Sequence, residues 1–312
     1  MYYPYLRGKQ FELLALREFV TIYAETCHVF PIIEPVKSSF NSMKLAIKKL
    51  NEVNVSFALI LNPKKGELVG KFETVLAELN EVLVEGFWTP AYIVDYRNSK
   101  GISAHINEMN YASVMLICDE SVDTNQAAFK QLLELDQVMK VVFADNNRSF
   151  KRELSRLQKE AIRIDDKFNA QKRNSDYENI PEEQFSEEVF YYKEDNFAGF
   201  SDYTVLSSEY IEGGMLPKAL AIHFTYQKNK EIWIKHFVSD TNDDNSNIQL
   251  KFAEAAVKAI GFFEQLPFTN NAIEELKRYY STEQYPGLGV LKKLSIKSHL
   301  ELINVILFNQ AL

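Results

Sequence analysis

Short apolar runs alternate with longer stretches of helical periodicity along the first half of the chain. The first pair is residues 2–6, rich in tyrosine, and residues 9–25, where apolar side chains recur at intervals of three and four positions. The same alternation continues to residue 164 and predicts six more strands with helices between them. We expect these strands over residues 29–36, 55–61, 91–96, 113–118, 140–144 and 161–164.

Seven strands separated by helices predict a parallel sheet, because parallel neighbours need long crossover connections. Such a sheet is either open and doubly wound or closed into a barrel. An eighth apolar run at residues 199–206 favours closure. No GxGxxG motif follows the first strand, which weakens the dinucleotide-binding form of the open sheet. We therefore predict an α/β protein of the (β/α)8 TIM-like barrel class.

Two long segments interrupt the alternation. Residues 167–198, after the seventh strand, carry four basic and eight acidic side chains and form an acidic insertion. Residues 207–246, after the eighth strand, contain a β-hairpin pattern between positions 219 and 238. Extra helical patterns follow at the C-terminus. We expect a barrel domain over residues 1–266 with both insertions, and a helical extension over residues 267–312 packed on the barrel.

The composition excludes several classes of protein. The 312 residues are 46% hydrophobic and 25% charged, which is typical of a globular chain and not of a disordered or collagen-like one. The net charge of −8 argues against duplex nucleic acid as a partner. Cys27 and Cys118 show neither disulfide-framework nor metal-motif spacing, so we expect reduced thiols. The chain has no membrane-spanning run and no signal-peptide pattern at its start, so we expect a cytoplasmic protein.

Charged and amide side chains recur where the predicted strands end. In β/α barrels the loops at the carboxyl ends of the strands build the site, so these side chains are the candidates for chemistry. Carboxylates that converge on one mouth repel one another and need basic partners or a cation. The candidates in chain order are Arg7, Lys9, Glu34, Asn62, Asp95, Arg97, Asp119, Asp145, Asp165 and Asp202.

Three carboxylates lie in otherwise apolar strands, and we predict them to be catalytic: Glu34, Asp95 and Asp202. Glu34 and Asp202 are the predicted metal ligands, with Mg²⁺ or Mn²⁺ as the cofactor. The basic residues would neutralise an anionic substrate such as a phosphate ester. The predicted ligand-binding residues are Arg7, Lys9, Asn62, Arg97, Asp119, Asp145 and Asp165.

A structural role is the alternative for several of these residues. Asp and Asn after a strand are ordinary helix caps and turn residues, which applies to Asp119, Asp145 and Asp165. Arg7 could be a structural partner of Glu34. The sequence contains no HExxH, GxSxG or P-loop motif, which excludes the zincin, α/β-hydrolase and Walker-type readings.

Three segments of the chain resemble the phage "Beta protein" family. They are residues 3–16 (YPYLRGKQFELLAL), residues 31–35 (PIIEP) and residues 199–203 (GFSDY). The family comprises poorly characterised proteins of phages, prophages and bacterial genomic islands. The resemblance implies a barrel-like protein in phage–host conflict, and it supplies no established catalytic residues.

These observations leave two hypotheses open. In the first, the protein serves in anti-phage defence and recognises or hydrolyses a phosphorylated or nucleotide-like ligand at the barrel mouth. If it is an enzyme, it would be a metal-dependent hydrolase resembling a phosphodiesterase. In the second, it is a non-catalytic protein that binds a phage or host polypeptide through the insertions at residues 167–198 and 207–246. The partner is thus an anionic small molecule or a protein, and no membrane is involved.

Overall fold

The computed structural model describes residues 1–213 and 218–311, and these residues form two compact units. The barrel unit consists of Met1–Gln10, Cys27–Asp166 and Tyr191–Asp202. The second unit comprises Phe11–Thr26, Lys167–Phe190 and Tyr203–Leu312. Residues 214–217 of the predicted second insertion, and residue 312, lie outside the described residues. The predicted division at residue 266 falls inside the second unit.

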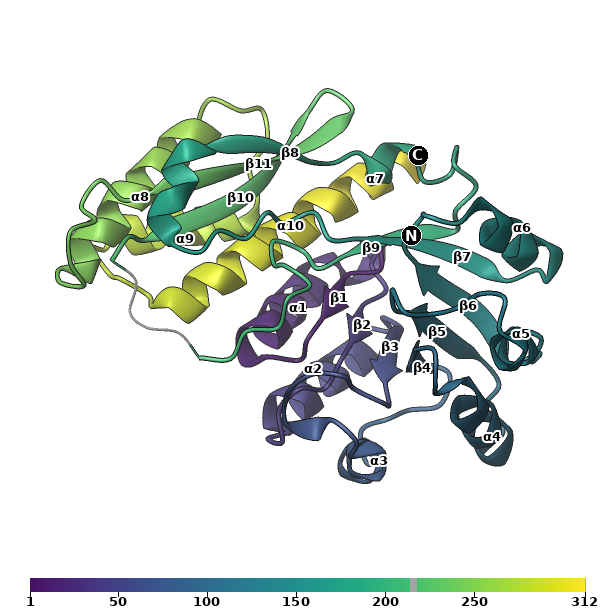
Figure 1. Cartoon of the computed structure of the whole chain (residues 1–312). Helices are drawn as coiled ribbons and strands as arrows, with labels where there is room; N and C mark the ends of the chain where they lie inside the picture. The colour runs from purple at the N-terminus through teal and green to yellow at the C-terminus, as the bar shows by residue number, and fades with distance from the viewer. Residues whose placement is uncertain (214–217, 312) are drawn as a thin grey trace. The chain divides into compact units, whose positions relative to one another are not determined.

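The barrel unit contains an eight-stranded sheet in which every neighbouring pair is parallel. The strands, in spatial order, are β1 (Tyr5–Leu6), β2 (Ile32–Ile33), β3 (Phe57–Ile60), β4 (Trp88–Val94), β5 (Val114–Cys118), β6 (Val138–Phe143), β7 (Glu160–Asp165) and β9 (Gly199–Asp202). They form a nearly closed barrel that alternates with helices (Figure 1), which confirms the predicted (β/α)8 class.

Helices connect successive strands on the outer side of the sheet (Figure 1). They are α2 (Asn41–Glu52), α3 (Phe72–Leu79), α4 (Ser99–Met109), α5 (Ala127–Leu133) and α6 (Arg148–Arg156). The first helix, α1 (Gln10–Tyr23), belongs to the second unit except for Gln10.

Residues near the N-terminus close the barrel. Tyr2 forms parallel bridges to Val29 on one side and to Phe200 on the other. The backbone N–H of Tyr3 donates to the carbonyl oxygen of Phe200 at 2.8 Å. Gly199 permits this close approach, because a Cβ atom there would lie only 2.7 Å from the carbonyl oxygen of Met1. The first and last strands of the sheet are therefore joined through main-chain contacts.

The first two strands are shorter than predicted because prolines interrupt them. Pro4 separates the Tyr2 bridge from β1, and Pro31 separates the Val29 bridge from β2. Proline has no N–H to donate, so it breaks the ladder at its own position. The carbonyl oxygen of Pro4 still accepts from the N–H of Ile32 at 2.9 Å, so the chains stay in register.

The second unit is built around a three-stranded antiparallel sheet with the order β10-β11-β8. Strands β10 (Ala221–Lys228) and β11 (Glu231–Val238) form the predicted hairpin. Strand β8 (Glu182–Ser186) comes from the acidic insertion and pairs with β11. The acidic insertion therefore contributes one strand to this sheet.

Helices complete the second unit. They are α7 (Glu188–Tyr191), which ends in the barrel unit, α8 (Ile248–Phe263), α9 (Asn271–Ser281) and α10 (Leu288–Ala311). Helix α8 contacts β10 and β11, and α10 contacts β10 and α9. Phe224 of β10, Phe252 of α8 and Leu276 of α9 are fully buried in one hydrophobic cluster, so the second unit has a core of its own. Within the described residues, no helix combines the length and the apolar character that crossing a bilayer requires.

Candidate functional site

Charged side chains gather at the carboxyl ends of four adjacent strands of the barrel. Arg7 directly follows β1, Glu34 follows β2, Lys64 lies in the loop after β3, and Asp95 follows β4. Parallel neighbours bring their carboxyl ends to the same edge of a sheet, so all four belong to one end of the barrel. We call these four residues the mouth cluster.

Two neighbouring segments hold the carboxylate of Glu34. The hydroxyl of Tyr5 donates to Oε2 at 2.9 Å, and the backbone N–H of Lys64 donates to Oε1 at 2.8 Å. Glu34 is 2% exposed, and a carboxylate so deeply buried needs donors of this kind. The side chain is therefore fixed in position by β1 and by the loop after β3.

Lys64 connects Glu34 to Asp95. Its ammonium group forms an ion pair with Oδ2 of Asp95, while Oδ1 accepts from the backbone N–H groups of Arg97 and Asn98 at 2.8 and 3.1 Å. Burial alone would raise the pKa of Asp95, but the hydrogen bonds from Lys64 and from these backbone groups outweigh it and lower the pKa. Asp95 is thus held as a carboxylate beside a half-buried ammonium group.

Asp202 has a different setting at the point where the barrel closes. It is 4% exposed and accepts a hydrogen bond from the hydroxyl of Tyr2 at 2.5 Å. Burial, followed by the charge of Asp202, raises the pKa of Tyr2 well above its ordinary value, so the phenol remains a donor. Tyr2 also stacks on Phe200 of β9, with ring centroids 5.1 Å apart. This arrangement supports the closing contact.

Other candidates make local contacts that shape the strand ends. The side chain of Asn62 exchanges two hydrogen bonds of 2.8 Å with the backbone of Ile93, and so extends the pairing of β3 with β4. Asp119 is exposed and accepts from the N–H and the hydroxyl of Ser121 at 2.8 and 2.6 Å. These contacts are those of a turn residue, the structural role that the sequence analysis gave as the alternative for Asp119.

The carboxylates after β6 and at the end of β7 both face Arg163. Its Nε lies 2.8 Å from Oδ2 of Asp165, and its Nη1 lies 4.0 Å from Oδ2 of Asp145. The cap of α6 is not Asp145 but Asn147, whose side chain accepts from the N–H of Phe150 at 3.1 Å. These carboxylates already have a protein partner of opposite charge.

Two basic candidates flank the mouth cluster. Arg97 is exposed, and its guanidinium lies 4.6 Å from the ring centroid of the neighbouring Tyr96. Lys9 is half-buried two residues after Arg7. Their predicted contacts with a ligand remain predictions.

Lys64 belongs to the mouth cluster, and sequence reasoning missed it. The expected site residue of this loop was Asn62, which directly follows the apolar run of the third strand. The available signal was the buried Pro63, three residues after the end of β3, and the basic pair Lys64-Lys65 after it. A lysine this close to a strand end can reach the neighbouring carboxylates.

A metal centre receives no support from the side-chain positions. Among the described residues, no three His, Cys, Asp or Glu side chains are arranged so that they could hold a metal ion. Glu34 and Asp202, the predicted metal ligands, each accept a hydrogen bond from a tyrosine. The prediction of Mg²⁺ or Mn²⁺ at the mouth therefore rests on the presence of the carboxylates and not on their arrangement among the described residues.

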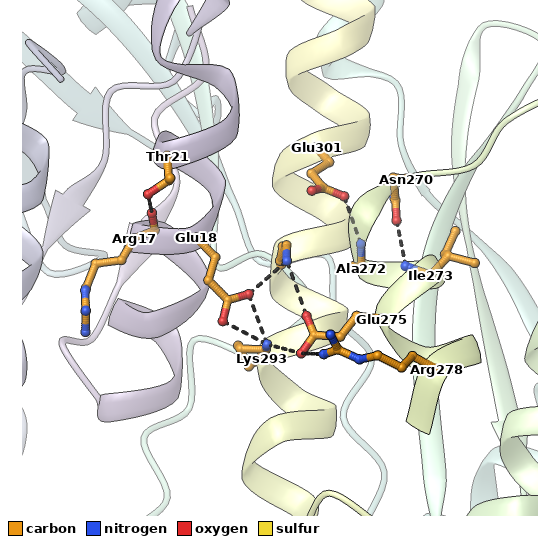
Figure 2. A network of polar contacts seen from close by, with 11 residues as sticks. Arg17, Glu18, Thr21, Asn270, Ala272, Ile273, Glu275, Arg278, Lys293 and Glu301 are labelled. Carbon is orange, nitrogen blue, oxygen red and sulfur yellow. Dashed lines mark hydrogen bonds and ion pairs between the residues drawn. The ribbon is translucent and has the colours of Figure 1, made fainter. Parts of the chain in front are cut away.

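A second set of buried charges lies in the second unit (Figure 2). Glu18 of α1 and Glu275 of α9 reach α10 and contact Lys293 and Lys297. Lys293 lies 2.9 Å from Glu18 and 2.7 Å from Glu275, and Lys297 lies 2.8 and 3.3 Å from the same two carboxylates. Each lysine touches both glutamates, and the exposed Arg278 of α9 also lies 3.8 Å from Glu275. We call the two lysines and the two glutamates the helix network.

Comparisons with known proteins identify no relative, since no family model, curated protein or solved structure matches the chain.

Proposed function

We propose that the protein recognises a phosphorylated or nucleotide-like small molecule at the mouth of its barrel, and that it acts in the cytoplasm in phage–host conflict. The observation that supports this proposal is the position of Lys64 between Glu34 and Asp95. The biological setting rests on the resemblance of residues 3–16, 31–35 and 199–203 to the phage "Beta protein" family.

The mouth cluster offers cations in a fixed place. The side chain of Lys64 is 35% exposed and Asp95 orients its ammonium group, so we expect a ligand to reach this group from solvent. An ammonium group has three donors, and it binds phosphate oxygens readily. Arg7, at the end of β1, adds a guanidinium at the same end of the barrel.

Recognition is favoured over hydrolysis. Each of the three predicted catalytic carboxylates already accepts a hydrogen bond or ion pair from the protein: Glu34 from Tyr5, Asp95 from Lys64 and Asp202 from Tyr2. A hydrolase of the predicted type would need such carboxylates to bind a metal ion or activate water. Hydrolysis would thus require these contacts to break first.

Thermal unfolding with defined anions tests the proposal. Inorganic phosphate, pyrophosphate and a panel of nucleotides would each be added with and without Mg²⁺ or Mn²⁺. We expect at least one phosphate compound to raise the Tm of the wild-type protein, and Lys64→Met to weaken its binding by about tenfold or more. Lys65→Met is the matched control, because Lys65 is exposed and adjacent, and it should respond like the wild type.

Two results would decide against this function. If none of the compounds shifted the Tm, the proposal that the mouth recognises a phosphorylated ligand would be wrong. A shift that needs the metal ion and disappears in Glu34→Gln would favour the metal-dependent hydrolase instead.

One observation favours the second hypothesis, a protein that binds a polypeptide. The two insertions fold together, since β8 from the first pairs with β11 from the second. A separately packed unit is a common form of interaction module. Glu187, exposed in the acidic insertion, offers a place to test charge complementarity with a basic partner.

Co-purification from the native host distinguishes the two hypotheses. We expect an interaction module to capture one basic protein, and Glu187→Lys to lose that protein while any phosphate-induced shift in Tm persists. If the wild type and Glu187→Lys captured the protein equally, the surface around Glu187 would not be the binding site for that partner.

A further inference from the structure

A cavity of about 760 Å³ opens at the end of the barrel unit opposite the mouth cluster. It lies between the end of α3, the start of β4 and the turn that connects α4 to β5. Trp88 begins β4 and Asp95 directly follows it, so the length of this strand separates the two places by roughly 20 Å. Volumes of this size are typical of small-molecule sites.

Aromatic rings form part of the cavity wall. Trp88 and Tyr111 both line it, and their ring centroids lie 6.1 Å apart at an interplanar angle of 80°. Behind Tyr111, the ring of His105 lies 6.2 Å away and is held by a 2.7 Å hydrogen bond between its Nδ1 and the hydroxyl of Tyr92. The wall is therefore supported by a packed second layer.

The rest of the lining mixes apolar side chains with the neutral polar residues Asn80, Thr89, Asn110 and Ser113. Leu76 and Leu83 come from α3 and the segment after it, and Met109 ends α4. Met109 is 43% exposed, so an apolar side chain stands at the rim in contact with solvent. Such a lining favours a ligand with an apolar body.

The charge around the cavity is negative. Glu85 is the only charged residue of the lining. The two chain segments that build the cavity, residues 72–90 and 105–113, contain five glutamates and no lysine or arginine. Lys44 pairs with Glu78 and Glu81, which leaves Glu85 without that compensation. Burial lowers the pKa of His105, so this ring adds no positive charge at neutral pH.

We propose that this cavity binds a small organic cation with an apolar or aromatic body. A cation that enters the cavity beside Trp88 and Tyr111 gains the attraction of an aromatic π-system, and Glu85 supplies the opposite charge. The apolar part of the ligand would contact Leu76, Leu83 and Met109. The site is independent of the mouth cluster, and it would persist if the proposed phosphate recognition were wrong.

Trp88 provides the signal for a direct test. The chain has two tryptophans, so Trp233→Phe leaves Trp88 as the only one. Three benzyl compounds then serve as probes: benzyltrimethylammonium, the neutral neopentylbenzene and the anion benzylsulfonate. We expect the cation to change Trp88 fluorescence and to bind about threefold or more tightly than the neutral compound, with the anion weakest. Ligand-observed NMR gives the same affinities without the fluorophore.

Substitutions at the rim locate the binding. Glu85→Gln should weaken the binding of the cation by about threefold and leave the affinity for the neutral compound unchanged. Glu81→Gln is the matched control, because Glu81 pairs with Lys44 and does not line the cavity, and it should bind the cation like the parent. Met109→Lys places an ammonium group at an exposed rim position and should exclude the cation. Equal affinities for the three probes, unchanged binding in Glu85→Gln, or no response of Trp88 would overturn the proposal.

Discussion

Two sets of charged side chains in this protein pair lysines with carboxylates and differ in how far the lysine side chains are exposed. In the helix network, two lysines meet two glutamates, and every one of the four ion pairs is within 3.3 Å. In the mouth cluster, Lys64 contacts Glu34 through its backbone N–H and Asp95 through its ammonium group, and the hydroxyl of Tyr5 also donates to Glu34.

We interpret the helix network as structural support, and under the proposed function the mouth cluster is the binding site. The helix network joins three helices, and its lysine side chains are 3% and 6% exposed, so they present little surface to a ligand. Lys64 is 35% exposed and stands on a loop at the end of a barrel, where sites occur in this architecture. A charge that is oriented but still accessible can serve recognition.

Breaking the helix network should have the largest effect on stability. Lys293→Met leaves Lys297 as the lysine that Glu18 and Glu275 share, with the exposed Arg278 3.8 Å from Glu275. Removing one partner of a buried ion pair typically costs about 3–5 kcal/mol. We expect a loss of this size in the free energy of unfolding, measured by urea denaturation at pH 7.

An exposed pair on the same helices provides the control. Lys277 and Glu274 are 3.1 Å apart, with side chains 31% and 55% exposed. Lys277→Met should therefore cost less than about 1 kcal/mol. Similar losses for Lys277→Met and Lys293→Met would show that burial does not distinguish the helix network.

The loop that carries Lys64 depends on a glycine, which gives the next largest effect. Gly66 has φ +77°, and a Cβ atom there would collide with the carbonyl oxygen of Val36. We expect Gly66→Ala to cost about 2–3 kcal/mol and to abolish the phosphate response, because Lys64 lies two residues before it.

Gly70→Ala separates the backbone strain from the collision. Gly70 has φ +74° but open space around the missing Cβ, so its substitution should cost about 1 kcal/mol from the left-handed conformation alone. If urea denaturation gave the two alanine variants the same stability, the contact with Val36 would have no part in shaping the mouth.

The barrel was predictable because its signals are local. The strands of the barrel unit coincide with short apolar runs in the sequence, and the helices between them show a helical spacing of apolar residues. The closing contact of Tyr2 with Phe200 joins residues far apart in the chain, but it follows once eight parallel strands are assumed. Arg7, Glu34 and Asp95 could likewise be assigned to one end of the barrel from their positions after strands.

Partners distant in sequence explain what could not be predicted. Strand β8 looks like a polar segment because Glu182 and Glu183 precede its one buried aromatic residue, Phe185. These glutamates contact Lys235 and His236 of β11, at 3.0 and 3.4 Å, and no local pattern reveals those partners. The pairing of Lys64 with Asp95 was missed for the same reason.

Removing Lys64 should affect stability less than removing Lys293. Its side chain is more exposed, so we expect Lys64→Met to cost about 1–2 kcal/mol at pH 7. The pKa of Asp95 is lowered in the folded state, so the stabilisation is present above the ordinary value of 3.8 and is lost as the pH falls through the lower value. Urea denaturation should therefore show the wild type and Lys64→Met converging at acidic pH. A difference that stayed constant with pH would mean that Asp95 is not the partner that matters.

The smallest effect concerns a carboxyl on the same helix as the network lysines. Glu301 of α10 is fully buried and accepts from the N–H of Ala272 at 3.2 Å (Figure 2). Burial raises the pKa of Glu301 above 4.5, so the folded state holds the proton more tightly than the unfolded state does. Stability must then fall as the pH rises through this range. Glutamine carries no such charge, so Glu301→Gln should gain stability relative to the wild type between pH 4 and pH 7.

Glu275→Gln should show the opposite sign, and it thereby tests the role of charge balance directly. Burial acts on Glu275 as well, but Lys293 and Lys297 outweigh it and lower its pKa. Its stabilisation is present above 4.5 and lost as the pH falls, so Glu275→Gln should lose stability relative to the wild type as the pH rises. The measurement is the difference in unfolding free energy between each variant and the wild type, by urea denaturation from pH 4 to pH 7. If this difference changes with pH in opposite directions for the two variants, partners, and not burial, decide whether an ionised carboxyl stabilises this unit. If the stability difference changed with pH in the same direction for both variants, the two lysines would not compensate the charge of Glu275.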